Sequence, residues 1–182
     1  MSHVRRETRE TTVEVRLAAG AGAAKCESGI PFLDHMLATL ARYAGVDLEV
    51  QASGDLRHHV IEDVALTLGR ALRAEIPEAA ARFGDRTVAM DDALVHAAVD
   101  LGGRVYYRGP LPSTLYDHWM RSLSDSAGIT LHLRVIRGRD RHHVVEAAFK
   151  ALGLALRTAL ACGAGGGVFS TKGAVSVEEK PC

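Results

Sequence analysis

The chain has few lysines, cysteines and aromatic residues, and neither sign of charge is in excess. Its 22 basic residues balance 22 acidic ones, and no basic block stands out. This balance argues against nucleic acid or an anionic membrane surface as a partner. No apolar run approaches the roughly 18 residues that span a bilayer, and the N-terminus is charged rather than signal-like. We therefore expect no membrane association.

The cysteines exclude two further classes of protein. Cys26, Cys162 and Cys182 are odd in number and lack the spacing of a metal motif, so neither a disulfide framework nor a zinc finger is indicated. Reduced thiols in a cytoplasmic protein are the simplest account. With 182 residues and 47% hydrophobic content, the chain is long enough to bury a core as one domain.

What the chain does contain is one motif that occurs twice. His58-His59-Val60-Ile61-Glu62 returns 84 residues later as His142-His143-Val144-Val145-Glu146. Residues i and i+4 share a helix face, so each first histidine lies over its glutamate and the second points about a quarter turn away. Such residues are ligands for first-row transition metals. A single copy would equally fit a helix start with solvated histidines, but the repetition favours metal binding.

The repeat extends beyond this motif. Residues 58–76 and 142–160 share nine identities in nineteen, and residues 34–50 match 117–133. A lone histidine precedes each pair, His35 by 23 residues and His118 by 24. This pattern predicts a single domain, 1–182, made of two similar halves at about 1–84 and 85–182.

Each half thus offers one lone histidine, one histidine pair and one glutamate. The eight candidate ligands are His35, His58, His59, Glu62, His118, His142, His143 and Glu146. Two ions with four protein ligands each would use all of them. That leaves open positions on Mn, Fe or Co, which favour about six ligands, or on a catalytic Zn.

Hydrophobic periodicity places the helices and strands. Strands are predicted over 11–17, 46–51, 93–100 and 129–136, and helices over 35–43 (with Asp34 as its cap), 58–75, 118–126 and 142–161. Strands with helices packed on one face predict an α+β architecture.

A second, weaker signal concerns phosphate. The glycine-rich stretch 163–167 is followed by Ser170-Thr171-Lys172-Gly173, which offers amides, hydroxyls and one positive charge to an anionic oxygen cluster. The spacing is not that of a P-loop, and a plain glycine-rich turn would also explain it. Arg82 and Arg104 could add contacts from loops.

Lysine is scarce enough for its positions to be informative. Only four of the 22 basic residues are lysines, and lysine supplies a compact point charge that arginine does not. Lys172 lies in the candidate phosphate segment, and Lys150 lies four residues beyond Glu146. Ordinary surface lysines remain the alternative for both.

Taken in order, the segments resemble the imidazoleglycerol-phosphate dehydratase family over nearly the whole chain. The matching segments are 6–11 (RETRET), 28–37 (SGIPFLDHML), 58–63 (HHVIED), 82–84 (RFG), 90–94 (MDDAL), 100–104 (DLGGR), 142–151 (HHVVEAAFKA) and 170–173 (STKG). The two histidine motifs together with Ser-Thr-Lys-Gly make the combination specific. The chain departs from the family pattern by a shorter loop after Gly54-Asp55-Leu56, by Arg57 in place of an acid, by Asp140 in place of Asn and by Gly102 in place of Ser.

The resemblance implies a fold, a reaction and an assembly. The fold would be internally duplicated, with four helices sandwiched between two four-stranded sheets. The reaction would be the dehydration of imidazole glycerol phosphate to imidazole acetol phosphate in histidine biosynthesis. Two Mn²⁺ per active site are implied, other divalent metals being possible. The assembly would be a 24-mer built from trimers, with sites shared between subunits.

The resemblance also assigns roles to residues. All eight candidate ligands would hold the metal ions. Contacts to the substrate phosphate fall on Arg82, Arg104, Ser170 and Lys172. Substrate-facing or proton-transfer positions fall on Glu10, Asp91 and Lys150, and either Glu10 or Glu62 could be the base.

Two other functions fit the same ligand set. A dinuclear phosphate-ester hydrolase would use the metals to generate hydroxide and would release inorganic phosphate. A non-catalytic paralogue would use the metals only to staple subunits together, but would not need the Ser-Thr-Lys-Gly segment, Arg82 and Arg104.

Overall fold

The two halves of the chain fold into the same series of elements. The computed structural model describes residues 1–102 and 104–162. The first half forms β1 (Ser2–Glu7), β2 (Thr11–Ala19), β3 (Ala24–Glu27), α1 (Pro31–Ala44), β4 (Val46–Gly54) and α2 (Arg57–Glu75). The second forms β5 (Phe83–Met90), β6 (Ala93–Asp100), β7 (Tyr106–Arg108), α3 (Thr114–Ala127), β8 (Thr130–Arg137) and α4 (Arg141–Leu160). The element order confirms the duplication.

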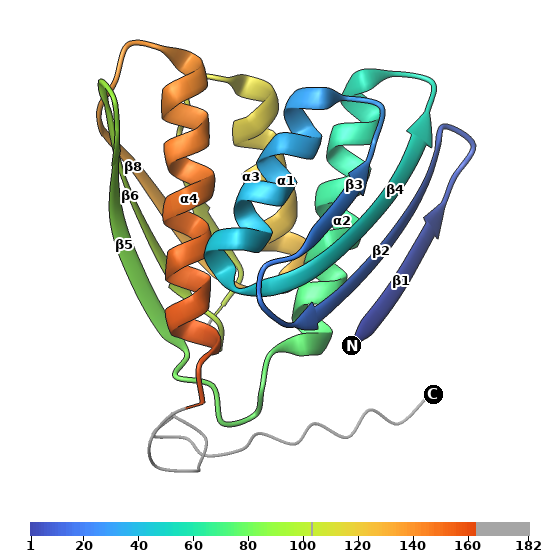
Figure 1. The fold of residues 1–182 in the computed structure, drawn as a ribbon, viewed down its shortest axis with the longest axis horizontal. Coiled ribbons are helices and arrows are strands. Elements are labelled where there is room, and N and C mark those ends of the chain that lie inside the picture. The colour runs from blue at the N-terminus through green and yellow to red at the C-terminus, as the bar shows by residue number, and fades with distance from the viewer. Residues whose placement is uncertain (103, 163–182) are drawn as a thin grey trace, which may run out of the picture.

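Each half contributes one mixed sheet. The strand orders are β1-β2-β4-β3 and β5-β6-β8-β7, and only the pairs β3–β4 and β7–β8 are parallel. The helices fill the space between the sheets, with α1 and α2 on the first and α3 and α4 on the second (Figure 1). The predicted arrangement of four helices between two four-stranded sheets is therefore confirmed.

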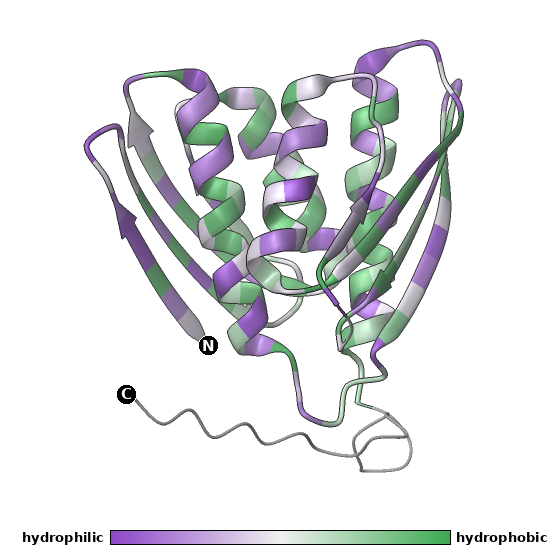
Figure 2. Ribbon diagram, turned by 180° about the vertical axis from the view of Figure 1, so that it is seen from behind, coloured by the Kyte–Doolittle hydropathy of each residue, from purple (hydrophilic) through white to green (hydrophobic). Residues whose placement is uncertain are grey.

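The core lies between the sheets and the helices. Along β2 and β6 every second residue is buried, as in Val13, Val15, Val95 and Ala97. Figure 2 shows hydrophobic and hydrophilic residues alternating along the strands and forming stripes on the helices. Removal of these apolar faces from water is the main stabilising term of such a layered domain. Among the described residues, no helix is both long and apolar enough to cross a membrane.

Helix α1 differs from its prediction at the N-terminus. It begins at Pro31 rather than His35, because proline is well suited to the first position of a helix. Asp34 is therefore not the cap: it lies inside the first turn and accepts hydrogen bonds from the backbone N–H (2.9 Å) and Oγ (2.6 Å) of Ser28. The predicted C-terminal stop is confirmed, since Gly45 has φ 70°, the left-handed conformation that glycine adopts without strain.

The two halves meet through helix pairs that cross between them. Helix α2 packs on α3, and α1 packs on α4. All four helices begin at the same end of the molecule (Figure 1). The N-terminal turns that carry the repeated histidine motifs therefore lie at one end.

Candidate metal centre

The first cluster combines residues of two helices. Nε2 of His58 lies 3.4 Å from Oε2 of Glu62, its i+4 neighbour on α2, and Nε2 of His118 on α3 lies 3.2 Å from Oε1 of Glu62. The two imidazole rings stack with centroids 5.7 Å apart. One ligand atom from each of the three residues lies within 4.8 Å of the others. This is the spacing of groups that can share one cation.

One atom of this cluster favours a metal over a plain ion pair. Nε2 of His118 is buried yet has no hydrogen-bond partner among the described residues, although Glu62 is close. A buried polar atom without a partner costs free energy, and a bound cation would supply that partner. The donors therefore fit a divalent first-row metal.

The second cluster repeats the first with residues of α1 and α4. Nε2 of His142 and Nε2 of His35 lie 3.2 and 3.6 Å from Oε2 of Glu146. The other oxygen of Glu146 accepts a hydrogen bond from Nζ of Lys150 at 2.9 Å. Burial alone would raise the pKa of Glu146, but the hydrogen bond and charge of Lys150 together with the interaction with His35 outweigh it, so the pKa is lowered and the carboxylate is charged.

In each cluster the lone histidine comes from the other half of the chain. His118 of the second half joins His58 and Glu62 of the first, whereas His35 of the first half joins His142 and Glu146 of the second. The structure thus brings together six of the eight predicted ligands, three in each cluster. Neither half contains a complete cluster.

The remaining two predicted ligands, His59 and His143, point elsewhere. Nδ1–H of His59 donates to Oδ1 of Asp55 at 2.8 Å, and Nδ1–H of His143 donates to Oδ1 of Asp92 at 2.8 Å. These bonds raise the pKa of both histidines. They also fix the tautomer of each ring and leave Nε2 as the available ligand atom. In metal sites, a carboxylate commonly orients a ligating histidine through its other ring nitrogen in this way.

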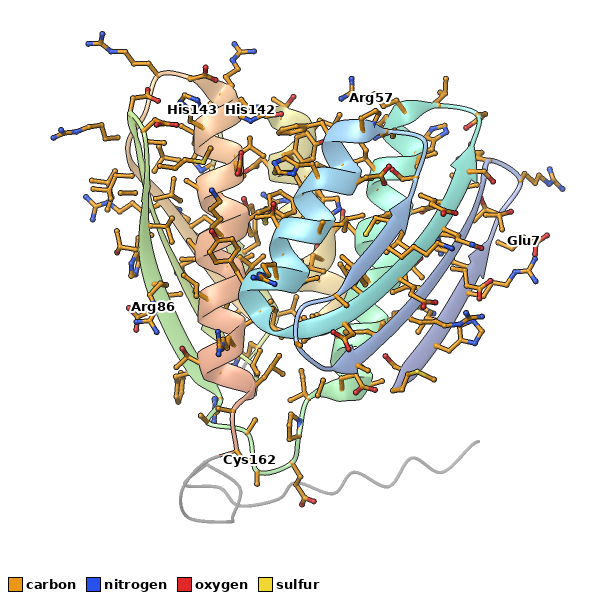
Figure 3. The ribbon with its side chains drawn as sticks, viewed as in Figure 1. Glu7, Arg57, Arg86, His142, His143 and Cys162 are labelled. Atoms are coloured by element: carbon orange, nitrogen blue, oxygen red, sulfur yellow. The ribbon has the colours of Figure 1, made fainter. Side chains whose placement is uncertain are left out.

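Two carboxylates predicted at substrate-facing or proton-transfer positions lie beside these histidines. Oε2 of Glu10 lies 3.6 Å from Nδ1 of His59, and Oδ2 of Asp91 lies 3.6 Å from Nε2 of His143. Figure 3 shows His142, His143 and Arg57 at the same end of the molecule, where α2 and α4 begin.

The sequence did not predict three carboxylates that hydrogen-bond to site residues and orient them. Asp55 precedes His59 by four residues, a spacing that could have revealed it. Asp92 lies 51 residues from His143, and Asp100 lies 18 residues from Arg82, so spacing gave no signal. Backbone N–H groups of Arg139 and Asp140 also donate to Asp92; with the bond from His143, they lower its pKa to about 2.

Two of the family departures near the histidine motifs, the short loop and Asp140, have defined structural roles. The short loop before His58 still supplies Asp55, which orients His59. Asp140 is the N-cap of α4, because its Oδ1 accepts a hydrogen bond from the backbone N–H of His142 at 2.8 Å. At the start of α2, by contrast, no side chain caps the helix.

The described arginines predicted to bind phosphate lie away from both clusters. Nε and an Nη of Arg82 donate to the two carboxylate oxygens of Asp100, at 2.7 and 3.1 Å. The backbone N–H of Arg82 bonds to Ala159, 17 residues beyond His142 on α4. At about 1.5 Å per residue, that is about 25 Å along the helix. Arg104 is exposed on the segment before β7, and Ser170 and Lys172 lie outside the described residues.

Two predicted site residues have unusual backbone conformations. Arg82 has φ 72° and Asp91 has φ 48°, and they are the non-glycine residues with positive φ in the described part of the chain. Such conformations cost free energy and are concentrated at functional sites. This observation independently draws attention to both positions.

Comparison with known proteins agrees with this geometry. A family model described as imidazoleglycerol-phosphate dehydratase matches residues 28–156. The imidazoleglycerol-phosphate dehydratase of Pyrobaculum calidifontis is 51% identical, over 93% of this chain and 97% of that protein. That of Methanoculleus marisnigri is 46% identical, over 96% of this chain and 98% of that protein.

Solved structures of the same kind superpose on the fold. The structure from Pyrococcus furiosus has a TM-score of 0.84 at 38% identity, covering 94% of this chain and 99% of that chain. The structure from Staphylococcus aureus has a TM-score of 0.79 at 28% identity, covering 90% and 100%.

Proposed function

The chain belongs to the imidazoleglycerol-phosphate dehydratase family, and on that premise we propose how its residues carry out the reaction. The activity is that of a hydro-lyase of histidine biosynthesis, which removes water from imidazole glycerol phosphate to give imidazole acetol phosphate. The observation that carries the proposed site is the pair of matching His-His-Glu clusters at one end of the molecule.

We propose that each cluster holds one divalent ion, with Mn²⁺ as the expected metal. His58, Glu62 and His118 would hold one ion, and the corresponding residues of the second cluster the other. Bound ions would supply the positive charge that favours the anionic form of the substrate's imidazole ring, making loss of the neighbouring hydroxyl easier. Glu62 has both oxygens directed at imidazoles, which suits a ligand better than a free base.

Proton transfer then falls to groups beside the clusters. Glu10 is exposed and stands next to His59, so we assign it the role of base that removes the proton from carbon. Lys150 would return a proton to the ring-side carbon or to the leaving hydroxyl. Asp91 would contact the substrate. The hydroxyl and one proton leave as water, so the reaction consumes no other reactant.

We further propose that each active site is completed by more than one subunit. Each cluster has three candidate ligands from its own chain, whereas His59 and His143 bond through Nδ1 to Asp55 and Asp92 and keep Nε2 for another partner. Arg82 lies about 25 Å along α4 from the metal ligands, too far to hold the phosphate of a substrate bound at its own cluster. Both facts are accounted for if the cluster of one chain faces His59, His143, Arg82 and Arg104 of others, as in the expected 24-mer built from trimers. Ser170 and Lys172 would join them at the phosphate.

One assay tests the proposal against its alternatives. Metal-free protein is incubated with imidazole glycerol phosphate with and without Mn²⁺, and the products are identified. We expect imidazole acetol phosphate only when metal is present. Release of inorganic phosphate without the keto phosphate would identify a hydrolase instead. Tight metal binding without any turnover would identify a non-catalytic, metal-stapled protein.

A further inference from the structure

The two clusters have matching ligands but different surroundings. Lys150 lies one helical turn beyond Glu146, and its Nζ donates to Oε1 of Glu146 at 2.9 Å. The equivalent position in the first half, four residues beyond Glu62, is Leu66. Among the described residues, Glu62 makes ion-pair contacts only with the imidazoles of its own cluster. Among the described residues, the glutamate of one cluster therefore contacts an ammonium group, whereas that of the other does not.

The ammonium group of Lys150 is held in place by its surroundings. Nζ lies 3.4 Å from Sδ of Met90 and 5.9 Å from the ring centroid of Tyr43, in addition to its bond with Glu146. The side chains of Lys150 and Glu146 are 18% and 10% exposed, whereas that of Glu62 is 34% exposed. Water therefore screens the charge at the second cluster less than it would at the first.

This asymmetry has a consequence for metal binding. A cation bound by Oε2 of Glu146 must share the carboxylate with the ammonium of Lys150, and like charges repel. The repulsion between a divalent and a monovalent cation a few ångströms apart exceeds RT several-fold even at an effective dielectric constant of about 20. The ammonium of Lys150 also neutralises part of the negative charge of the Glu146 carboxylate through their hydrogen bond.

We propose that the two clusters bind metal with unequal affinity and that Lys150 is the cause. The cluster of His58, Glu62 and His118 fills first, and the cluster beside Lys150 fills at an Mn²⁺ concentration at least about tenfold higher. The inference rests on the proposed function, because it takes both clusters to be metal sites. It adds an order of filling that the matching ligand sets do not imply.

The test measures each cluster separately in the full-length chain. Metal-free His142→Ala reports the first cluster, and metal-free His58→Ala reports the second. Equilibrium dialysis against graded Mn²⁺, with bound metal determined by mass spectrometry, gives the midpoint for each. We expect the midpoint of His58→Ala to be at least about tenfold higher than that of His142→Ala.

A reciprocal pair of substitutions then tests the cause. Lys150→Met keeps the length of the side chain but removes its charge; added to His58→Ala, it should lower the midpoint about tenfold. Leu66→Lys places an ammonium at the matching position; added to His142→Ala, it should raise the midpoint. Leu66 is partly exposed, so the new side chain has a route to solvent. Circular dichroism of each variant checks that the chain is folded, and the opposite expected signs separate a charge effect from general damage.

Each result has a distinct meaning. Equal midpoints for the two clusters would overturn the inference but leave both metal sites in place. A midpoint that Lys150→Met leaves unchanged or raises would also overturn it, since Lys150 would then be neutral or would orient Glu146 for the ion. Absence of metal at both clusters of the unsubstituted chain would instead overturn the proposed function.

Discussion

The substitution Gly153→Ala tests whether close packing of α1 on α4 builds the second cluster. A Cβ at residue 153 would lie 2.8 Å from Cβ of Tyr43, 3.0 Å from the carbonyl oxygen of Leu40 and 3.1 Å from the backbone nitrogen of Ala44. All three belong to α1, and two are backbone atoms that cannot rotate away. Because ordinary contacts are about 3.5–4 Å, α1 would have to move by roughly 0.5–1 Å.

Two opposing terms set the magnitude. Alanine stabilises a helix interior by about 1 kcal/mol relative to glycine, whereas overpacking of a core costs about 1–3 kcal/mol. The clash with α1 backbone places Gly153→Ala toward the upper part of that range, so we expect a net loss of about 1–2 kcal/mol. For a chain of this length, that lowers Tm by about 2–8 °C.

The assay is thermal and urea unfolding of the metal-free protein, followed by Mn²⁺ titration. Since α1 carries His35 and α4 carries Glu146, Gly153→Ala should also weaken Mn²⁺ binding at their cluster. Gly69→Ala is the matched control. Its Cβ would lie 2.8 Å from the carbonyl oxygen of Leu123 on α3, so this substitution should weaken Mn²⁺ binding at the other cluster. An unchanged or raised Tm for Gly153→Ala would show that helix propensity outweighs the clash and would refute the packing argument.

Three further predictions concern ligands, assembly and pH. His59→Ala or His143→Ala should abolish turnover in a folded chain; more than about a tenth of the original activity with metal loaded would contradict a ligand role. Chelation should convert a large particle into smaller oligomers that Mn²⁺ restores, because an ion bound between subunits stabilises only the assembled state; sedimentation with unchanged mass after verified metal removal would rule this out. Burial acts to raise the pKa of Asp100, but the hydrogen bonds from Arg82 and the Gly102 N–H, together with the positive charge of Arg82, outweigh it and lower the pKa. The resulting stability is present above the unfolded pKa of about 4 and is lost as pH falls through the folded pKa, so Asp100→Asn should flatten the decline of stability in acid.

The sequence predicted the central strands and all four helices but no edge strand. Strands β2, β4, β6 and β8 occupy the inner positions of the sheets, and each overlaps a predicted strand. The four unpredicted strands, β1, β3, β5 and β7, are all at sheet edges. Edge strands tend to be short or polar, which weakens the alternation that reveals a strand. In Ala24–Glu27 only Cys26 is partly buried, and the other residues are exposed.

The candidate site was predictable in its ligand types but not in its pairing. Spacing alone places each first histidine over its glutamate on one helix, and the structure confirms both pairs. The partner of each lone histidine depends on which helices pack together, and two similar halves make both choices equally consistent with the sequence. Gly69 and Gly153 mark close helix contacts without identifying the neighbouring helix.

The packing of helices across the two halves decides which glutamate each lone histidine joins. It also explains why each cluster depends on both copies of the repeat. His118 reaches Glu62 only because α3 packs on α2, and His35 reaches Glu146 only because α1 packs on α4. A chain reduced to one half would keep a histidine pair and its glutamate but would lose the third ligand of its cluster. The buried core has the same dependence, since residues of both halves form one hydrophobic cluster. Duplication in this chain would therefore join folding to the proposed metal binding, because the contact that buries the helices also completes each proposed ligand set.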